Sequence, residues 1–314
     1  MTASTTSASR PPANLTGLVE EACRQAGYPT GARLLRHFAN AVYLLDQVPV
    51  VARIGYGPHA VTKATTAIAV TRWLGEQDFP ATAPADLPSG AEQPLISHTT
   101  GRHVVATFWH YYPQPAGTDW PDTGVLGRLA ATLHELPMPP MALSGYQPLR
   151  TLAATVHDRA ARLALTEEQH AWLIDRIDKL RAAFENLDFP LGPGLIHADM
   201  YTGNLLWNTT DHGHPVVLGD WDSVCIGPRE IDLIPTYAEP RFGVDPSTVD
   251  VFARAYGHDL RHWPGYDLLY DIRELSTLTA LVRLAPANDR LRAELTHRLR
   301  LLQQGDRTTP WHGQ

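Results

Sequence analysis

The feature that most constrains the fold of this chain is a pair of short apolar segments, each of which ends in acidic residues. The first, residues 195–199, reads Leu-Ile-His-Ala-Asp, and Asn204 follows five residues after the aspartate. The second, residues 216–222, reads Val-Val-Leu-Gly-Asp-Trp-Asp. Short apolar runs bounded by polar residues indicate buried strands. The segment therefore predicts short strands with functional side chains on the loops between them.

These acids and the amide have the spacing that phosphoryl transfer requires. Asp199 can accept the proton of an attacking hydroxyl, because a positioned carboxylate is sufficient when the transition state is loose. Asn204 and Asp220 offer the hard oxygen ligands that Mg²⁺ prefers beside the phosphates of a nucleoside triphosphate, either ATP or GTP. Asp222 has two interpretations: it gives the metal a second carboxylate, or it hydrogen-bonds backbone groups in the turn. The pattern predicts a small-molecule kinase.

Two further residues are predicted to support the loop rather than to react. His197 lies two residues before the aspartate and can fix the loop by bonding backbone groups. Asp232 follows in the segment Gly-Pro-Arg-Glu-Ile-Asp-Leu, residues 227–233. Its carboxylate can cap the next helix and accept hydrogen bonds from the backbone of the catalytic loop. Both roles are structural, and both are needed for the geometry of the loop.

Composition excludes several other classes of protein. The 314 residues are 44% hydrophobic and 19% charged, with a net charge of −7, so no strongly basic field exists for nucleic acid or an anionic membrane. No apolar run approaches the roughly 18–20 residues that span a bilayer. Cys23 and Cys225 are the only cysteines and indicate neither a disulfide framework nor a metal cluster. We expect a cytoplasmic protein of unknown oligomeric state, and a disordered tail over residues 1–12.

The order of the elements predicts an α+β fold of two lobes. The N-lobe, residues 13–112, is expected to hold a small antiparallel sheet and a helix. The C-lobe, residues 113–314, is expected to be larger and mainly helical, with the catalytic loop, the metal site and the substrate pocket. Strand patterns cover residues 33–38, 41–45, 48–54, 94–97 and 103–110, and helical patterns cover 15–28, 60–75, 123–136, 167–187, 247–257, 266–285 and 288–304.

The N-lobe also carries candidate nucleotide contacts. Arg53, at the end of the third expected strand, either binds the α- and β-phosphates or is an exposed strand arginine. Trp109, His110 and Tyr111 lie where the two lobes join. Backbone groups at such a hinge can pair with a purine edge and the aromatic rings can stack on it, although core packing of Trp109 is an equal alternative.

Taken together, these motifs resemble the aminoglycoside phosphotransferase family, which has a protein-kinase-like fold. The resemblance rests on His197-x-Asp199-x-x-x-x-Asn204, on Asp220 and on Gly227-Pro-x-x-x-Asp232-Leu. It extends to Leu-His-Glu-Leu-Pro at 133–137, to Arg-Trp-Leu-Gly-Glu-Gln-Asp-Phe-Pro at 72–80, to Val-Ala-Arg-Ile at 51–54 and to Asn-Ala-Val-Tyr at 40–43. The last of these resembles the loop that covers the nucleotide, which implies that Asn40 contacts it.

The chain departs from the family at one pair of positions. The strand position that holds lysine in the family is Arg53, and the helix position expected to hold its glutamate partner is Ala67. Arg53 then meets the phosphates alone, or another acid such as Glu76 serves as its partner.

The resemblance leaves the substrate open. Residues 190–314 contain 16 acids and 11 arginines. Four of those acids are motif residues, so little negative charge remains to bind a polycation. We expect a neutral or weakly charged hydroxylated antibiotic, of nucleoside or macrolide type, that phosphorylation inactivates to give resistance. The alternatives are a kinase for a primary metabolite such as choline, homoserine or methylthioribose, and a catalytically inactive nucleotide-binding scaffold.

Overall fold

A computed structural model describes residues 14–37, 40–57, 59–99, 102–117 and 119–311. The tail expected over residues 1–12 lies outside this set. The chain forms two compact units. Unit 1 contains residues 1–121, 136–143 and 203–224, and unit 2 contains residues 122–135, 144–202 and 225–314. Among the described residues, no helix combines the length and apolar character needed to cross a membrane.

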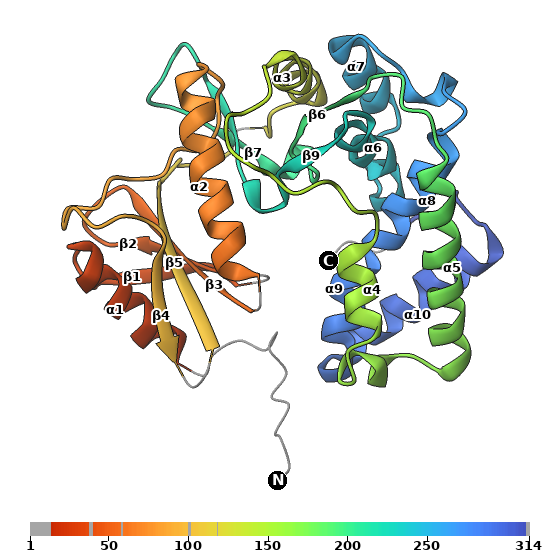
Figure 1. Cartoon of the computed structure of the whole chain (residues 1–314), viewed down its shortest axis with the longest axis horizontal. Helices are drawn as coiled ribbons and strands as arrows, with labels where there is room; N and C mark the ends of the chain where they lie inside the picture. Colours follow the sequence, from red (N-terminus) through yellow and green to blue (C-terminus); the bar gives the residue numbers. More distant parts are fainter. Residues whose placement is uncertain (1–13, 38–39, 58, 100–101, 118, 312–314) are drawn as a thin grey trace. The chain divides into compact units, whose positions relative to one another are not determined.

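Unit 1 is built on a five-stranded antiparallel sheet, as predicted (Figure 1). The strand order is β1-β2-β3-β5-β4. Alternation of buried and half-buried residues along β2 and β3 shows that one face of these strands meets the core. The strands are β1 Ala32–His37, β2 Ala41–Leu45, β3 Val50–Tyr56, β4 Leu95–Thr99 and β5 Arg102–His110.

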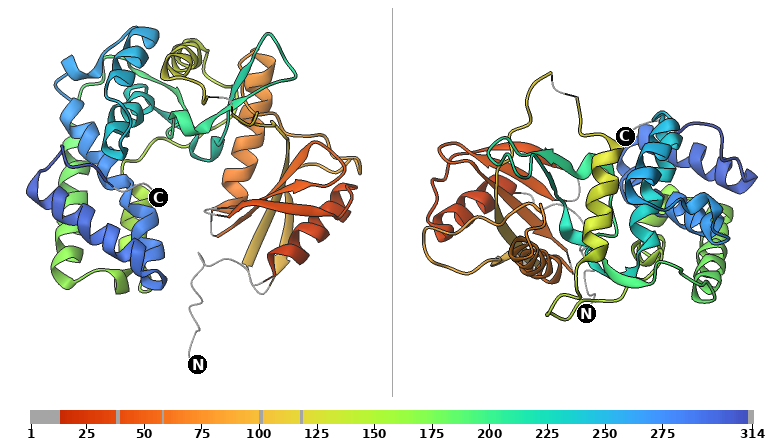
Figure 2. Two further views of the ribbon diagram at one scale, coloured as in Figure 1. Left: turned by 180° about the vertical axis from the view of Figure 1, so that it is seen from behind. Right: turned by 90° about the horizontal axis from the view of Figure 1, so that it is seen from above.

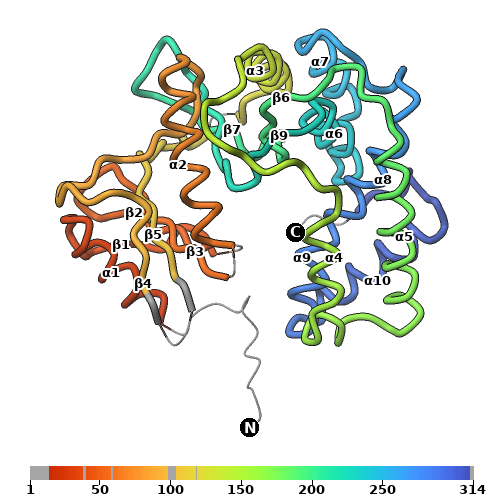
Figure 3. The backbone as a smooth tube through the Cα atoms, in the orientation of Figure 1, coloured from red at the N-terminus to blue at the C-terminus, as the bar shows by residue number. Residues whose placement is uncertain are grey.

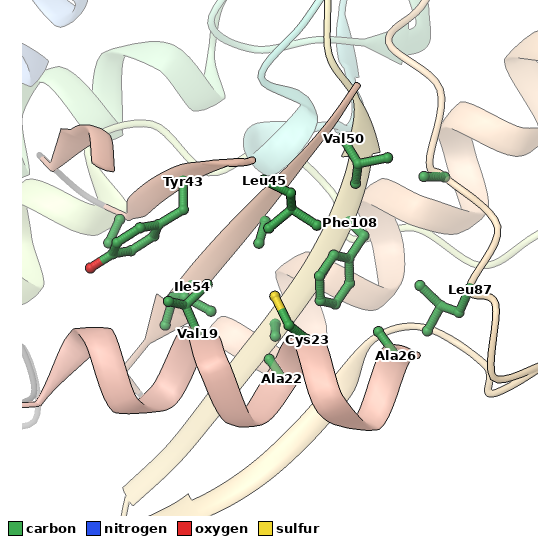
Figure 4. Close-up of a cluster of buried hydrophobic side chains, with 14 of the residues drawn as sticks. Val19, Ala22, Cys23, Ala26, Tyr43, Leu45, Val50, Ile54, Leu87 and Phe108 are labelled. Atoms are coloured by element: carbon green, nitrogen blue, oxygen red, sulfur yellow. The ribbon is translucent and has the colours of Figure 1, made fainter. Parts of the chain in front are cut away.

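The core of this sheet is closed by helix α1, Leu15–Ala26. Its buried residues share one helical face and pack beneath β2, β3 and β5 (Figure 4). The helix ends at Gly27, whose positive φ of 80° lets the backbone turn back onto the last carbonyls. The residues of this face that Figure 4 labels are Val19, Ala22, Cys23 and Ala26. The helical pattern predicted for residues 15–28 is confirmed, two residues shorter.

The second helix of unit 1, α2, spans Ala60–Glu76, in agreement with the prediction for 60–75. Both helices of the unit are seen from behind in Figure 2. After α2, Phe79 packs edge-on against Trp221 at 6.0 Å between ring centroids. The chain then runs beside β8, where the Thr82 N–H donates to the Leu218 carbonyl at 2.9 Å.

The same contacts explain why residues 203–224 group with the sheet. Strands β7, Leu205–Trp207, and β8, Val216–Leu218, form a two-stranded ribbon. The Leu218 N–H donates to the Pro80 carbonyl at 2.8 Å, so the ribbon is joined to the segment that follows α2. The sequence divided the chain at residue 112 and assigned the expected metal ligands to the C-lobe. The structure groups Asn204, Asp220 and Asp222 with unit 1 instead.

Unit 2 is mainly helical, as predicted. Its only strands in the described part of the chain, β6 Pro193–Ile196 and β9 Cys225–Pro228, form an antiparallel pair (Figure 3). Thr166 and Gln169 form a capping box at the start of α5. The helices are α3 Thr123–Glu135, α4 Arg150–Val156, α5 Glu167–Glu185, α6 Glu230–Ala238, α7 Ser247–Tyr256, α8 Tyr266–Ser276, α9 Leu278–Leu284 and α10 Asp289–Gln304, with 3₁₀ turns η1 Ala161–Ala164, η4 Glu239–Phe242, η5 Leu260–His262 and η6 Ala285–Ala287.

One expected helix is divided in two. The pattern at 266–285 predicts a single helix, and the structure has α8 and α9 with a break at Thr277. The hydroxyls of Ser276 and Thr277 donate to the carbonyls of Arg273 and Glu274. Such side-chain bonds compete with the helical ladder and loosen it.

A buried ion pair fixes the C-terminal part of unit 2. The Arg241 Nε lies 2.7 Å from the Glu274 Oε1, and both side chains are 2% exposed. Arg241 also donates to the carbonyls of Thr309 and Asp306, and its guanidinium stacks 4.4 Å from the ring centroid of Trp311. Arg241 therefore contacts several of the last described residues, and Arg298 lies over the same Trp311 ring at 4.8 Å.

We predict that Glu274→Leu lowers the free energy of unfolding by about 3–5 kcal/mol, because it leaves a buried guanidinium without its counter-charge. The exposed Glu185→Leu at the end of α5 is the control and should change it by less than about 0.5 kcal/mol. Urea unfolding followed by circular dichroism measures both. Equal midpoints for the two variants would contradict the role of the pair.

Candidate active site

The loop that carries Asp199 begins where β6 ends and is held by a buried carboxylate of the same unit. Asp232, in the first turn of α6, is fully buried. Its two oxygens accept the N–H groups of His197 at 2.8 Å and Ala198 at 2.6 Å. Ala198 has a φ of 61°, a value that residues other than glycine rarely adopt. The paired N–H groups therefore stabilise a backbone turn that is unfavourable by itself.

Asp232 is in turn supported by two residues from other helices. The Nε2 of His134, on α3, lies 3.2 Å from the Asp232 Oδ2, and the Nδ1 lies 2.9 Å from the Tyr256 hydroxyl of α7. Burial raises the pKa of Tyr256, so its hydroxyl keeps its proton and can donate to the imidazole. The sequence did not assign these two residues to the site. The Leu-His-Glu-Leu-Pro motif at 133–137 was the available signal for His134.

His197 is fully buried, and its Nδ1 accepts the N–H of Asp199 at 3.3 Å. The ring thus bonds backbone inside the loop, and the structural role of His197 stays a prediction. Asp199 differs: its side chain is 40% exposed. Arg273 of α8 donates from Nη1 to the Asp199 Oδ1 at 3.0 Å. No sequence pattern pointed to Arg273.

The second set of candidate residues lies in unit 1, at one end of the β7–β8 ribbon. Asn204 ends the 3₁₀ turn η2, Thr202–Asn204, just before β7, and Asp220 follows β8 by two residues. Antiparallel pairing of Leu205 with Leu218 brings these ends together, and the Gly219 N–H donates to the Asn204 carbonyl at 2.8 Å. The ribbon thus joins the backbone of Asn204 to that of Gly219, the residue before Asp220.

Arg53 of β3 connects two of the acids predicted for metal binding. Its Nη2 lies 3.0 Å from the Asp220 Oδ1 and 2.5 Å from the Asp222 Oδ2. Burial lowers the pKa of Arg53, but the carboxylates of Asp222 and Asp220 outweigh it, so the pKa is raised. Asn40 donates to the Asp222 Oδ2 at 3.1 Å, and Arg36 of β1 lies 3.9 Å from Asp220. The acids are therefore surrounded by donors.

These contacts identify the acids that pair with Arg53. Ala67 is buried on α2 and has no charge to offer. Glu76, the alternative partner, is the last residue of α2 and is exposed. Arg53 forms ion pairs with Asp220 and Asp222 instead, because the β7–β8 ribbon belongs to the same unit as β3. Asp222 thus makes side-chain contacts, rather than only the backbone bonds that its second interpretation expected.

The candidate nucleotide-base residues end β5. Trp109 is buried, and its indole donates to the Thr107 hydroxyl at 2.8 Å, so the indole N–H is used inside the unit. The N–H groups of His110 and Tyr111 donate to the carbonyls of Ala83 and Pro49 at 3.0 and 2.9 Å. Because these two N–H groups are already bonded, a purine edge would hydrogen-bond to other polar groups of this segment. Stacking of the base on the aromatic rings stays a prediction.

The donor set suits a hard divalent cation. Asp220, Asp222 and Asn204 would offer the hard oxygen ligands that Mg²⁺ prefers, and the metal would neutralise phosphate charge. Within the described ranges, no three His, Cys, Asp or Glu side chains group as a self-sufficient metal site.

The sheet of unit 1, the helical unit 2 and the anchored aspartate loop define the protein-kinase-like class of phosphotransferases. Comparisons with known proteins give the family. The model of the phosphotransferase enzyme family matches residues 31–269, so the chain belongs to that family. The comparison with curated protein sequences gave no significant match.

Several solved structures share the fold. The amicoumacin kinase hAmiN, in complex with AMP-PNP, Ca²⁺ and amicoumacin, is 14% identical, with a TM-score of 0.65 and coverage of 90% of this chain and 91% of that one. A microcompartment-associated aminopropanol kinase is 17% identical, with a TM-score of 0.67 and coverage of 93% and 98%. The spectinomycin phosphotransferase APH(9)-Ia is 16% identical, with a TM-score of 0.60 and coverage of 94% and 95%.

We predict that Asp232→Asn lowers the free energy of unfolding by about 1.5–3 kcal/mol, since a charged acceptor of backbone N–H groups is lost. The catalytic loop should also become mobile. Hydrogen exchange at His197 and Ala198 should accelerate, as mass spectrometry of loop peptides can show. Asp178→Asn, at an exposed position of α5, should change neither quantity. Wild-type exchange in Asp232→Asn would contradict the anchoring role.

Proposed function

We propose that the chain is a small-molecule O-phosphotransferase that moves the γ-phosphate of Mg-bound ATP or GTP to a hydroxyl. The observation that carries this proposal is the contrast between two aspartates of unit 2. Asp232 is buried and its oxygens are occupied by backbone N–H groups, whereas Asp199 is 40% exposed on the loop that Asp232 holds. Asp199 is the carboxylate that an acceptor hydroxyl can reach.

In the proposed reaction, the hydroxyl oxygen attacks the γ-phosphorus. The bond from that phosphorus to the β–γ bridging oxygen breaks, and the nucleoside diphosphate leaves with the electron pair. The hydroxyl proton passes to Asp199, which mainly orients the oxygen because proton transfer is late in a loose transition state. The products are a phosphate monoester and a nucleoside diphosphate.

Residues of unit 1 hold the donor in this proposal. Asn204 and Asp220 would bind Mg²⁺, with Asp222 as a further carboxylate, and Mg²⁺ when bound neutralises phosphate charge. Arg53 keeps the acids compensated and supplies a guanidinium that can contact the α- and β-phosphates. Asn40, Trp109, His110 and Tyr111 are proposed to contact the nucleotide from the first unit's sheet. Their positions near β2 and at the end of β5 support this assignment.

For the acceptor, we propose an antibiotic-type hydroxylated compound of neutral or weak charge, phosphorylated in the cytoplasm to give resistance. Antibiotic kinases among the similar structures support it. A primary-metabolite kinase is the second candidate, because the aminopropanol kinase and a choline/ethanolamine kinase family protein from Mesorhizobium loti share the fold. A thermal-shift screen of both compound classes with Mg·ATP and Mg·GTP, followed by mass detection of the phosphorylated product, distinguishes the two.

We predict that Asp199→Asn lowers kcat with any accepted compound by roughly 10²-fold or more, the scale of a lost general base. Nucleotide affinity should change little, because the donor ligands belong to other residues. Steady-state kinetics and nucleotide titration give the two values. Wild-type turnover in Asp199→Asn would overturn the catalytic assignment, and failure to bind any nucleotide would overturn the kinase proposal itself.

A further inference from the structure

Arg273 is a guanidinium placed directly beside the proposed catalytic carboxylate. It lies in the last turn of α8, its side chain is 23% exposed, and its Nη1 donates to the Asp199 Oδ1 at 3.0 Å. Within the part of the chain that the structure describes, this is the only hydrogen bond of the guanidinium. None of its nitrogens is among the buried polar atoms that lack a partner. The remaining donors therefore reach solvent.

A guanidinium has five N–H groups arranged as a planar fork. One of them bonds Asp199, so the others can bind a second planar anion in bidentate geometry. Arg273 is also largely covered by protein, which reduces screening of its charge by water. Such a side chain offers a carboxylate a stronger partner than an exposed surface arginine would.

Arg273 places a positive charge directly beside Asp199, where it can attract an anionic group of the acceptor. Glu239, a second acid in this region, is 8% exposed and accepts the Thr202 hydroxyl at 2.8 Å. Burial raises the pKa of Glu239, against the lowering effects of the Thr202 bonds and of the Arg273 charge. Arg273 and Asp199 form a locally neutral pair. An ammonium group next to the reacting hydroxyl would face the guanidinium at short range.

We propose that Arg273 binds a carboxylate of the acceptor and that the substrate class is hydroxy acids. Because the reacting hydroxyl and the carboxylate would bond the two members of one ion pair, only a few bonds separate them in the substrate. The inference rests on the proposed phosphotransferase function and refines its acceptor from weakly charged to anionic. Arg273 is then a specificity-determining residue that distinguishes an acid from the corresponding alcohol or amino alcohol.

Matched pairs of acceptors test this assignment. The pairs are D-glycerate and glycerol, and D-gluconate and D-glucitol, each with saturating Mg·ATP. The two members of a pair differ in whether a carboxylate or a hydroxymethyl group is present. Ethanolamine, 1-amino-2-propanol and spectinomycin represent cationic acceptors. Phosphate transfer is followed by mass spectrometry of the product and by release of the nucleoside diphosphate.

We predict that at least one acid is phosphorylated with a kcat/KM at least about tenfold above that of its alcohol. Arg273→Ala should lower kcat/KM for that acid by roughly 10- to 100-fold, mainly through KM, because a charge-assisted bidentate contact is lost. Any effect on kcat through the lost Asp199 contact should be shared by the alcohol, whose KM should change by less than about threefold. Arg273→Lys should restore only part of the loss, since a point charge replaces a fork. Arg254→Ala, an exposed arginine of α7, is the control.

Three results would overturn the inference. In the first, Arg273→Ala lowers kcat equally for both members of a pair and leaves the KM of the acid unchanged, which means that Arg273 only positions Asp199. In the second, a cationic acceptor is preferred over every acid. In the third, no acid gains phosphate. Nucleotide binding, and turnover with any other acceptor, are measured on the same samples. If the wild type binds nucleotide and phosphorylates another acceptor, the proposed function stands without the inference. If the wild type does neither, the proposed function is wrong as well.

Discussion

The burial of Asp232 is the interaction on which the path of the aspartate loop in unit 2 depends. A fully buried carboxylate must be compensated by hydrogen bonds, because desolvation of an unpaired charge is costly. Here the compensation comes from two consecutive backbone N–H groups of the aspartate loop and from His134. The carboxylate thereby determines the path of the chain between β6 and Asp199. A structural charge in α6 thus positions a functional charge on a loop.

In unit 1 a paired charge also lies at a turn with a positive φ, although the carboxylate of Asp220 is not fully buried. Asp220 has a φ of 61°, as Ala198 has in unit 2, and each such residue costs on the order of 1–3 kcal/mol. Asp220 is held by Arg53 and by the ribbon that begins at Asn204. The turns at Ala198 and Asp220 are therefore both strained and both held by a paired charge. We expect that removing the charge of Asp232 or of Arg53 would release the corresponding turn. Strain of this kind is often concentrated at functional sites.

Local patterns predicted much of this structure. The five strands, the helices α1 and α2 and the order of the motif were readable because hydrophobic periodicity and turn residues act over a few positions. The contacts between distant residues were not. Arg53 meets Asp220 across 167 positions, His134 meets Asp232 across 98 and Arg273 meets Asp199 across 74. The fold alone brings such pairs together. The partners of Arg53, and the contact of Arg273 with Asp199, therefore became visible only in the structure.

The central proposal is that the amide of Asn204 and the carboxylates of Asp220 and Asp222 hold the metal of a metal–nucleotide site. These residues group with the sheet of unit 1, and the proposal can be tested directly. The measurement is calorimetric titration of ATP and GTP with Mg²⁺ and with EDTA into the wild type and Asp220→Asn. The account predicts that Mg²⁺ tightens nucleotide binding by about tenfold or more in the wild type, on the scale of a few charge-assisted contacts. It predicts no such effect of Mg²⁺ in Asp220→Asn. An equal Mg²⁺ effect in both proteins would contradict the account.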